Sequence, residues 1–249
     1  MQTPKYQRVL IKFSGESLSG HGTGESIDPA QLDILATEIE QIVTEGIQVA
    51  LVLGGGNIWR GNRAIDRGMD AAQAHYMGML ATIINALAMQ DALERRGVMT
   101  RAMTAIKMDE VAEPYIRRRA VRHMEKGRVI ILAGGTGNPY FTTDSAAALR
   151  AAEIHAEVIL MAKNGVDGVY SADPRRDPTA VRFNRLSYMD VLRRGLTVMD
   201  STALTFCRQC HSDLLCFNAL AVWQHYRRIV MGEEVGTLVS KAEEEYSNG

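Results

Sequence analysis

Residues 133–145, AGGTGNPYFTTDS, directly follow the short apolar run RVIIL. Glycines allow the backbone to approach a ligand closely and to take positive φ values. Thr142, Thr143 and Asp144 can cap a helix, which we expect over residues 145–154. A strand, a glycine loop and a helix N-terminus together form an anion site. The stretch therefore predicts an α/β fold with a phosphate-binding loop at this point.

Two other glycine loops follow strand-like segments nearer the N-terminus. Their sequences, KFSG and GGGNIWRG, supply two cations, Lys12 and Arg60. Phosphoryl transfer depends mostly on positioning and on neutralising the charge of the moving oxygens. We therefore expect Lys12 and Arg60 to bind the transferring phosphoryl group. Asp144 and Asp200 are expected to orient these cations and to help hold Mg²⁺.

The rest of the chain alternates between strand-like and helix-like segments. Strands are predicted at residues 8–13, 48–53, 98–103, 128–132, 158–161, 214–217 and 237–239. Helices are predicted over residues 29–45, 70–96, 113–126, 145–154, 188–194, 201–209 and 221–228. Apolar strands that alternate with helices are typical of a parallel sheet covered on both faces. We therefore expect a three-layer α/β/α sandwich with a mostly parallel central sheet, and ligands at the carboxyl ends of its strands.

The composition excludes several classes of protein. The chain of 249 residues has 28 basic and 29 acidic side chains, whereas a dedicated nucleic-acid-binding domain is usually strongly basic. No apolar run approaches the roughly 18 residues of a membrane span, and the N-terminus, MQTPKYQR, lacks the apolar region of a signal peptide. The odd number of cysteines, three, is expected of reduced thiols. We expect a cytoplasmic protein that binds neither nucleic acid nor membranes.

The motifs that are present and absent limit which kind of phosphate-binding site the chain can have. GxxxxGK[ST] is absent and GxGxxG occurs at none of the three loops, which excludes P-loop kinases and argues against dinucleotide binding. Instead KFSGES, GGGNIWRG, MGMLAT, GTGNPYFTTDSAA, VDGVYSADPRRDPTA and VMDSTA, in this order, resemble the bacterial-type uridylate kinases of the amino acid kinase superfamily. The resemblance runs from about residue 6 to residue 240, and GTGNPYFTTD is its most specific part.

The resemblance implies one amino acid kinase domain over residues 1–249, with an acceptor-binding part at roughly 1–155 and an ATP-binding part at roughly 156–249. It also implies transfer of the ATP γ-phosphate to UMP in pyrimidine nucleotide biosynthesis, Mg²⁺ bound with ATP, a homohexamer, and GTP and UTP as effectors. An alternative within the superfamily is a kinase that acts on a carboxylate or carbamate, against which GTGNPYFTTD argues. A non-catalytic nucleotide-binding or storage protein on the same fold is the alternative of another class.

The resemblance also implies site residues, position by position. The catalytic residues would be Lys12, Arg60, Asp144 and Asp200. ATP would contact Lys12, Ser14, Gly15, Gly56, Arg60, Asn164, Tyr170 and Asp173. UMP would contact Gly55, His75, Thr136, Gly137, Asn138, Pro139, Tyr140, Phe141, Thr142 and Thr143. The GTP-responsive segment would comprise Gly20, His21, Gly22, Thr23, Gly24 and Glu25. Beyond the help expected from Asp144 and Asp200, no protein ligand of a metal is assigned.

The chain departs from the family pattern at two places. Where the family usually has an aspartate that contacts the UMP ribose, this chain has His75. Histidine lacks the paired acceptors of a carboxylate, so the residue is either a tolerated substitution or a weaker acceptor for the ribose. At residues 24–27 the chain has GESI where a glycine-aromatic-glycine run is common, and this change bears on GTP activation.

Two other patterns have structural interpretations. Cys207, Cys210 and His211 form the CxxCH signature of c-type haem attachment, with Cys216 nearby. Because haem attachment requires export, a buried helix with incidental thiols is the preferred interpretation. The basic run at residues 117–122 is interpreted as a solvated helix face or a subunit contact, given the balanced net charge.

Overall fold

The computed structural model describes residues 3–20, 24–163, 166–196, 198–210, 213–218, 225–241 and 245–246. The strands are β1 (Arg8–Phe13), β2 (Gln48–Leu53), β3 (Thr100–Thr104), β4 (Glu113–Pro114), β5 (Val129–Ala133), β6 (Val158–Lys163), β7 (Phe183–Ser187), β8 (Asp213–Asn218), β9 (Thr237–Ser240) and β10 (Glu245–Tyr246). The helices are the 3₁₀-helix η1 (Gly15–Leu18) and α1 (Pro29–Thr44), α2 (Gly61–Ile65), α3 (Ala71–Arg95), α4 (Arg117–Glu125), α5 (Thr143–Ile154), α6 (Tyr188–Arg193), α7 (Ser201–Cys210) and α8 (His225–Val230).

The strands of the described residues form one sheet in the order β10-β7-β9-β8-β6-β1-β2-β5-β3-β4. Strand β1 lies near its middle and pairs in parallel with β2 and β6. The pairs β8–β9 and β7–β10 are antiparallel. The expectation of a mostly parallel α/β sheet is therefore confirmed.

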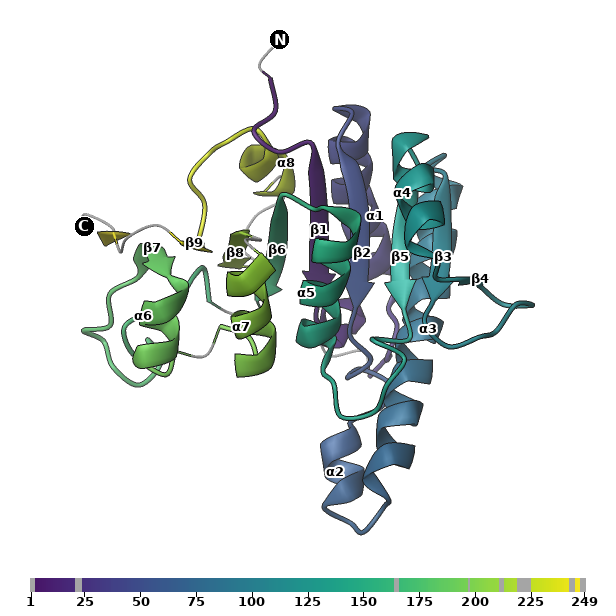
Figure 1. Ribbon diagram of the computed structural model, residues 1–249, viewed down its shortest axis with the longest axis horizontal. Coiled ribbons are helices and arrows are strands. Elements are labelled where there is room, and N and C mark those ends of the chain that lie inside the picture. Colours follow the sequence, from purple (N-terminus) through teal and green to yellow (C-terminus); the bar gives the residue numbers. More distant parts are fainter. Residues whose placement is uncertain are drawn as a thin grey trace.

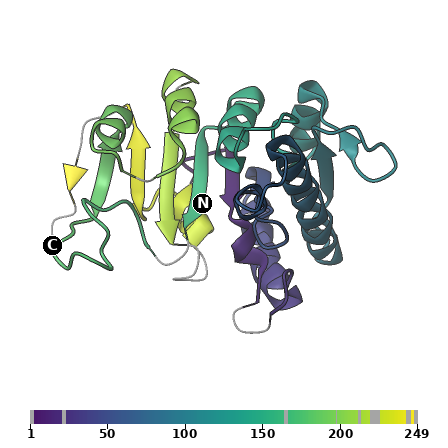
Figure 2. The ribbon, with the colours of Figure 1, turned by 90° about the horizontal axis from the view of Figure 1, so that it is seen from below.

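Helices cover both faces of the sheet (Figure 2). Side chains alternate between the two faces of a strand, so Val9, Ile11 and Phe13 pack into a core with α1, α3 and α8. Leu10 faces the other way, into a core with α4, α5, α6 and α7. These two cores make the molecule the three-layer sandwich that the sequence predicts.

The carboxyl ends of β1, β2 and β5 point to the same edge of the sheet, at the bottom of Figure 1. The three glycine loops leave the sheet at this edge. Helix α2 and the N-terminal end of α3 project beyond it (Figure 1). The fold thus brings together loops that are far apart in the sequence.

Some element boundaries differ from those expected. The helix predicted from residue 113 begins at Arg117, because Glu113 and Pro114 form strand β4 beside β3. A residue that precedes proline is pushed towards extended backbone, and the Tyr115 amide continues the pairing with a bond to the Thr104 carbonyl at 2.9 Å. Strands β7 and β10 and the short helices η1 and α2 were not anticipated. Helix α8 begins at His225, and residues 221–224 of the predicted helix lie outside the described residues.

Within the described residues, no helix combines the length and the apolar character that crossing a membrane requires.

Candidate functional site

Strand β1 and helix α5 bring Lys12 and Asp144 into contact. Lys12 lies two residues after Leu10, so its side chain faces the layer that contains α5. Thr142 caps α5 by accepting a hydrogen bond from the Ser145 amide at 3.1 Å, and Asp144 lies in the first turn. The Lys12 Nζ and Asp144 Oδ1 atoms are 2.9 Å apart, and the two side chains are 15% and 20% exposed. The lysine charge is therefore fixed and largely shielded from water at the edge of the sheet.

The glycines of the first two loops serve mainly to pack these loops together. A Cβ on Gly15 would lie 2.5 Å from Asn57 Oδ1 and 2.7 Å from the Gly56 amide nitrogen. A Cβ on Gly55 would lie 2.8 Å from the Gly78 carbonyl oxygen of α3. Gly56 is different, since its Cβ would meet no atom within 4 Å. Among the described residues, the Cβ position of Gly56 is therefore open, which leaves space for a ligand beside this part of the loop.

Arg60 is held above the second loop by two contacts. Its Nε donates to the Gly56 carbonyl at 3.3 Å, and its Nη2 forms an ion pair with Glu16 of η1. The Arg60 and Glu16 side chains are 47% and 48% exposed. Glu16 was not anticipated as a site residue, although it belongs to the KFSGES motif. The pair leaves the guanidinium accessible to a negatively charged ligand.

An open pocket of about 530 Å³ lies beside these loops. Ligand pockets for small molecules typically measure about 300–1,000 Å³. The predicted residues that line the pocket are Gly55, Gly56, Arg60, His75, Thr142 and Thr143. Glu16, Trp59, Arg63 and Thr82 also line it and were not predicted. The pocket therefore lies between the second glycine loop and the start of α5.

Asp200 connects the start of α5 to the start of α7. It accepts hydrogen bonds from the Thr142 hydroxyl, from the Ser145 hydroxyl at 3.3 Å, and from the Ala203 amide at 2.9 Å. We expected Asp200 to orient Lys12 or Arg60. In the part of the chain that the structure describes, its partners are two hydroxyls and an amide instead, because the residue caps α7. Asp144, by contrast, does contact Lys12, and its role in orienting the lysine stays a prediction.

The loop at residues 134–142 only partly reaches the pocket. Gly137 packs against Ala105, from whose Cβ an added Cβ would be 3.3 Å away. Thr136, Asn138 and Pro139 do not line the pocket, and Phe141 is 51% exposed. Of this loop, Thr142 lines the pocket, and the ring of Tyr140 lies 5.2 Å from that of His75, another residue of the pocket wall.

Tyr140 has an unusual backbone conformation. Its φ is 70°, a value that residues with side chains rarely adopt, and its side chain is 69% exposed. Such strain is often found at ligand sites. The Tyr140 ring contacts that of His75 at an angle of 47°. His75, the residue that stands where the family usually has an aspartate, therefore has a contact partner within this chain.

Of the residues expected to contact ATP, Gly56 and Arg60 line this pocket, whereas Ser14, Tyr170 and Asp173 do not. Ser14 caps η1 by accepting a hydrogen bond from the Glu16 amide. The Tyr170 hydroxyl donates to Asp167 at 2.6 Å, and this bond raises the pKa of Tyr170. Asp173 accepts from the Arg175 amide at 3.0 Å in a surface turn. Asn164 lies outside the described residues, so these four positions remain predictions.

Part of the expected GTP segment is described. The Gly20 amide donates to the Glu25 carbonyl at 3.3 Å, and Gly24 has a φ of 74°. His21, Gly22 and Thr23 lie outside the described residues. The effector role of the segment remains a prediction.

Buried polar groups hold the third glycine loop from behind. The Gly134 amide donates to the Thr82 hydroxyl at 2.9 Å. Arg150, which is 6% exposed, donates to the Gly135 carbonyl at 3.3 Å and to Glu153 at 2.7 Å. Its guanidinium also lies 4.0 Å from the centre of the Tyr115 ring. Thr82 and Arg150 are each a polar residue within an otherwise apolar helix, and this was the sequence signal that could have found them.

Replacing Arg150 by methionine should lower the free energy of unfolding by about 3 kcal/mol, because it leaves the Glu153 carboxylate without its buried partner. Urea denaturation would measure the change. Arg118→Met, at an exposed position of α4, is the control and should stay within about 0.5 kcal/mol of the original protein. Equal losses in the two variants would show that Arg150 has no special structural role.

The cysteines lie in and around α7. Cys207 is buried, and burial raises the pKa of its thiol to about 12. Cys210 is exposed and Cys216 is buried in β8. A thiol with so high a pKa is unreactive, which fits the interpretation of Cys207 as an incidental core residue.

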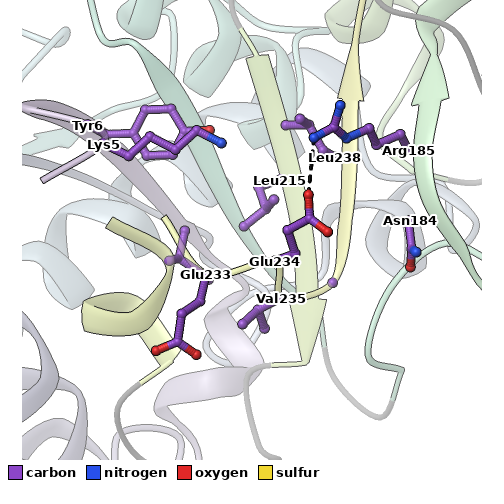
Figure 3. Close-up of a pocket in the computed structure, with 11 residues that line it drawn as sticks. Lys5, Tyr6, Asn184, Arg185, Leu215, Glu233, Glu234, Val235 and Leu238 are labelled. Carbon is purple, nitrogen blue, oxygen red and sulfur yellow. Dashed lines mark hydrogen bonds and ion pairs between the residues drawn. The ribbon is translucent and has the colours of Figure 1, made fainter. Parts of the chain in front are cut away.

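A second cleft lies between the N-terminal segment and strands β7, β8 and β9 (Figure 3). Lys5 and Tyr6 form one side, and the Arg185–Glu234 ion pair, at 3.1 Å, forms another. Its volume of about 30 Å³ leaves room for one or two water molecules. The cleft is therefore too small for a nucleotide.

Comparison with known proteins agrees with this geometry. The model of the amino acid kinase family matches residues 7–218. The crystal structure of UMP kinase from Bacillus anthracis is similar with a TM-score of 0.94 and 42% identity, over 98% of this chain and 99% of that one. UMP kinase from Ureaplasma parvum gives 0.89 and 42%, over 95% and 100%. Uridylate kinase from Archaeoglobus fulgidus gives 0.70 and 29%, over 93% and 99%.

Proposed function

Because the chain belongs to the amino acid kinase family, we propose that it is a UMP kinase that transfers the γ-phosphate of ATP to UMP, giving UDP and ADP. The observation that carries the proposal is the shielded Lys12–Asp144 pair, which lies at the same sheet edge as the pocket formed by the second glycine loop and α5. The similarity to UMP kinases over nearly the full length of the chain supports UMP as the acceptor.

The residues have distinct roles in this reaction. Lys12 binds the transferring phosphoryl group and stabilises the charge that spreads over its oxygens. Arg60 exchanges Glu16 for phosphate oxygens, which suit its planar array of donors. Asp144 keeps Lys12 in place, and Asp200 keeps Thr142 and Ser145 in place at the start of α5. The reaction thus depends on positioning and on charge, as phosphoryl transfer generally does.

The carboxylates at this edge suit a magnesium ion that arrives with ATP. Among the described residues, no three histidine, cysteine or acidic side chains gather into a metal site. Mg²⁺ is usually held by one or two carboxylates together with substrate phosphates and water. Asp144 and Asp200 are the residues that would hold it, and the ion would neutralise phosphate charge.

The remaining parts of the proposal rest on the family resemblance. They are a homohexamer, GTP and UTP as effectors, a cytoplasmic location, a place in pyrimidine nucleotide biosynthesis, and a division into an acceptor part at 1–155 and an ATP part at 156–249. The continuity of the sheet from β10 to β4 supports the treatment of both parts as one domain.

An assay of ADP release with UMP, CMP, dTMP and small acids as acceptors tests the function. We expect turnover with UMP and much less with the others. Turnover with a carboxylate or carbamate alone would favour the other branch of the superfamily. Nucleotide binding without any turnover would favour a non-catalytic binding protein and would overturn the proposal.

His75→Asp should tighten UMP binding about tenfold, since a charged acceptor strengthens a hydrogen bond to a ribose hydroxyl. The dissociation constant of UMP, measured by calorimetry, would show the change. Gln73→Asp, which adds the same charge at an exposed position of α3, serves as the control. An unchanged dissociation constant in His75→Asp would mean that the histidine is simply tolerated, and that its contact with Tyr140 has no role in UMP binding.

A further inference from the structure

Two asparagines behind the second glycine loop form a closed pair of side-chain amides. Asn85 of α3 donates to Asn57 Oδ1 at 2.8 Å, and Asn57 donates back to Asn85 Oδ1 at 3.0 Å. Asn85 is fully buried, whereas Asn57 is partly exposed. The bonds are reciprocal, so each amide fixes the orientation of the other.

The second N–H of each side-chain amide donates a hydrogen bond to a backbone carbonyl. Asn85 Nδ2 donates to the Gly54 carbonyl at 2.7 Å, and Asn57 Nδ2 donates to the Ser26 carbonyl at 2.7 Å. An NH₂ group has two donors, so all four N–H groups of the pair are satisfied. Any rotation of either amide would leave a buried polar group unpaired, which is costly.

The pair therefore connects three segments of backbone. Gly54 begins the second glycine loop, and Asn57 lies within it. The Asn57 Oδ1 atom also lies only 2.5 Å from the position that a Cβ on Gly15 would take, so the first loop packs on the same amide. Ser26 belongs to the segment between η1 and α1.

We propose that Asn57 and Asn85 are positioning residues that fix the Gly54–Gly56 backbone for phosphate binding and connect it to the segment at Ser26. With the Gly54 carbonyl held by Asn85, the following peptide units are oriented, and the Gly56 backbone is left next to open space in the pocket. The inference rests on the proposed function for the identity of the nucleotide, but the positioning itself concerns any phosphate ligand of this loop.

The test compares Asn85→Asp with the original protein. Aspartate has nearly the same shape, but its ionised form cannot donate to Gly54 and Asn57. Its protonated form can donate one hydrogen, and burial raises the pKa of a carboxyl group. We expect binding of ATP and UMP, measured by calorimetry at pH 8, to weaken by about 10- to 100-fold. Relative to the original protein at the same pH, much of this loss should be recovered at pH 5.5.

Asn184→Asp makes the same exchange at a half-buried position in β7. Asn184 is not among the residues proposed to contact a nucleotide, so this variant should leave binding unchanged. Thermal unfolding of each variant would verify that the assays use folded protein. A loss that is the same at both pH values, that also occurs in Asn184→Asp, or that is absent from Asn85→Asp would overturn the proposal.

If Asn85→Asp does not fold, Asn57→Ala provides the test, since that side chain is partly exposed. It should weaken binding of both nucleotides and of inorganic tripolyphosphate at least tenfold, and unaltered binding would contradict the positioning role. Because tripolyphosphate binding does not depend on turnover, this measurement remains decisive even if the original protein proves not to phosphorylate UMP.

Discussion

Lys12→Met should lower kcat by about 10³-fold, because it removes the fixed donor that we propose stabilises the charge of the transferring phosphoryl group. In the structure the lysine charge is balanced by Asp144 at 2.9 Å, and both side chains are largely shielded from water. Methionine would leave the carboxylate facing the phosphates. Steady-state turnover with saturating ATP and UMP measures the effect, and circular dichroism verifies the fold.

The double variant Lys12→Met/Asp144→Asn separates the two causes of this loss. Removing the unpaired carboxylate should restore part of the nucleotide affinity, but it should not restore kcat, because the cation is still missing. Lys12→Arg is a second comparison that keeps the charge with a different shape. Recovery of kcat in the double variant would show that Lys12 only neutralises Asp144.

Arg60→Ala should also reduce kcat by about 10³-fold if the guanidinium stabilises charge in the transition state. The side chain is half exposed and is held over the pocket by Glu16 and by the Gly56 carbonyl. Alanine therefore removes a half-exposed cation without leaving a cavity in the core. Turnover and the dissociation constant of UMP should be measured together, so that binding and catalysis are distinguished.

Glu16→Gln is the matched control for Arg60. Exposed ion pairs contribute about 0–1 kcal/mol, so loss of this pair should change kcat by no more than about fivefold. A loss below tenfold in Arg60→Ala would remove the catalytic role proposed for the arginine. A large loss in Glu16→Gln would instead show that the ion pair must persist during turnover.

The central strands were predictable because their sequences are strongly apolar. The predicted bounds of β1 and β2 agree with the structure, and Asp28 and Pro29 mark the start of α1. Strand β7 was missed because its sequence, FNRLS, mixes polar and apolar side chains, of which only Phe183 and Leu186 are buried. The local sequence pattern predicts a strand well when most of its side chains are buried. It predicts a strand poorly when pairing with distant strands decides the conformation.

The site was predictable only where a residue type has one evident use. Lys12 at the end of a strand and Asp144 at the start of a helix indicated a charged pair at the sheet edge. The partners of Arg60 and Asp200 could not be derived in this way, since a carboxylate can serve a cation, a hydroxyl or a helix cap equally well. Asn85 lies in the apolar run MGMLATIINALAM, where only the structure shows which backbone group it meets.

The order of the strands also has a consequence for how the protein reaches its active form. Lys12 pairs in register with Val52 on one side and with Met161 on the other. Parallel pairing between segments so distant in the sequence is slow, because the chain must close long loops before such contacts stabilise it. During refolding, the lysine thus acquires its complete surroundings only after β6 has docked. Catalytic competence should be among the last properties to return, well after most helical structure has formed.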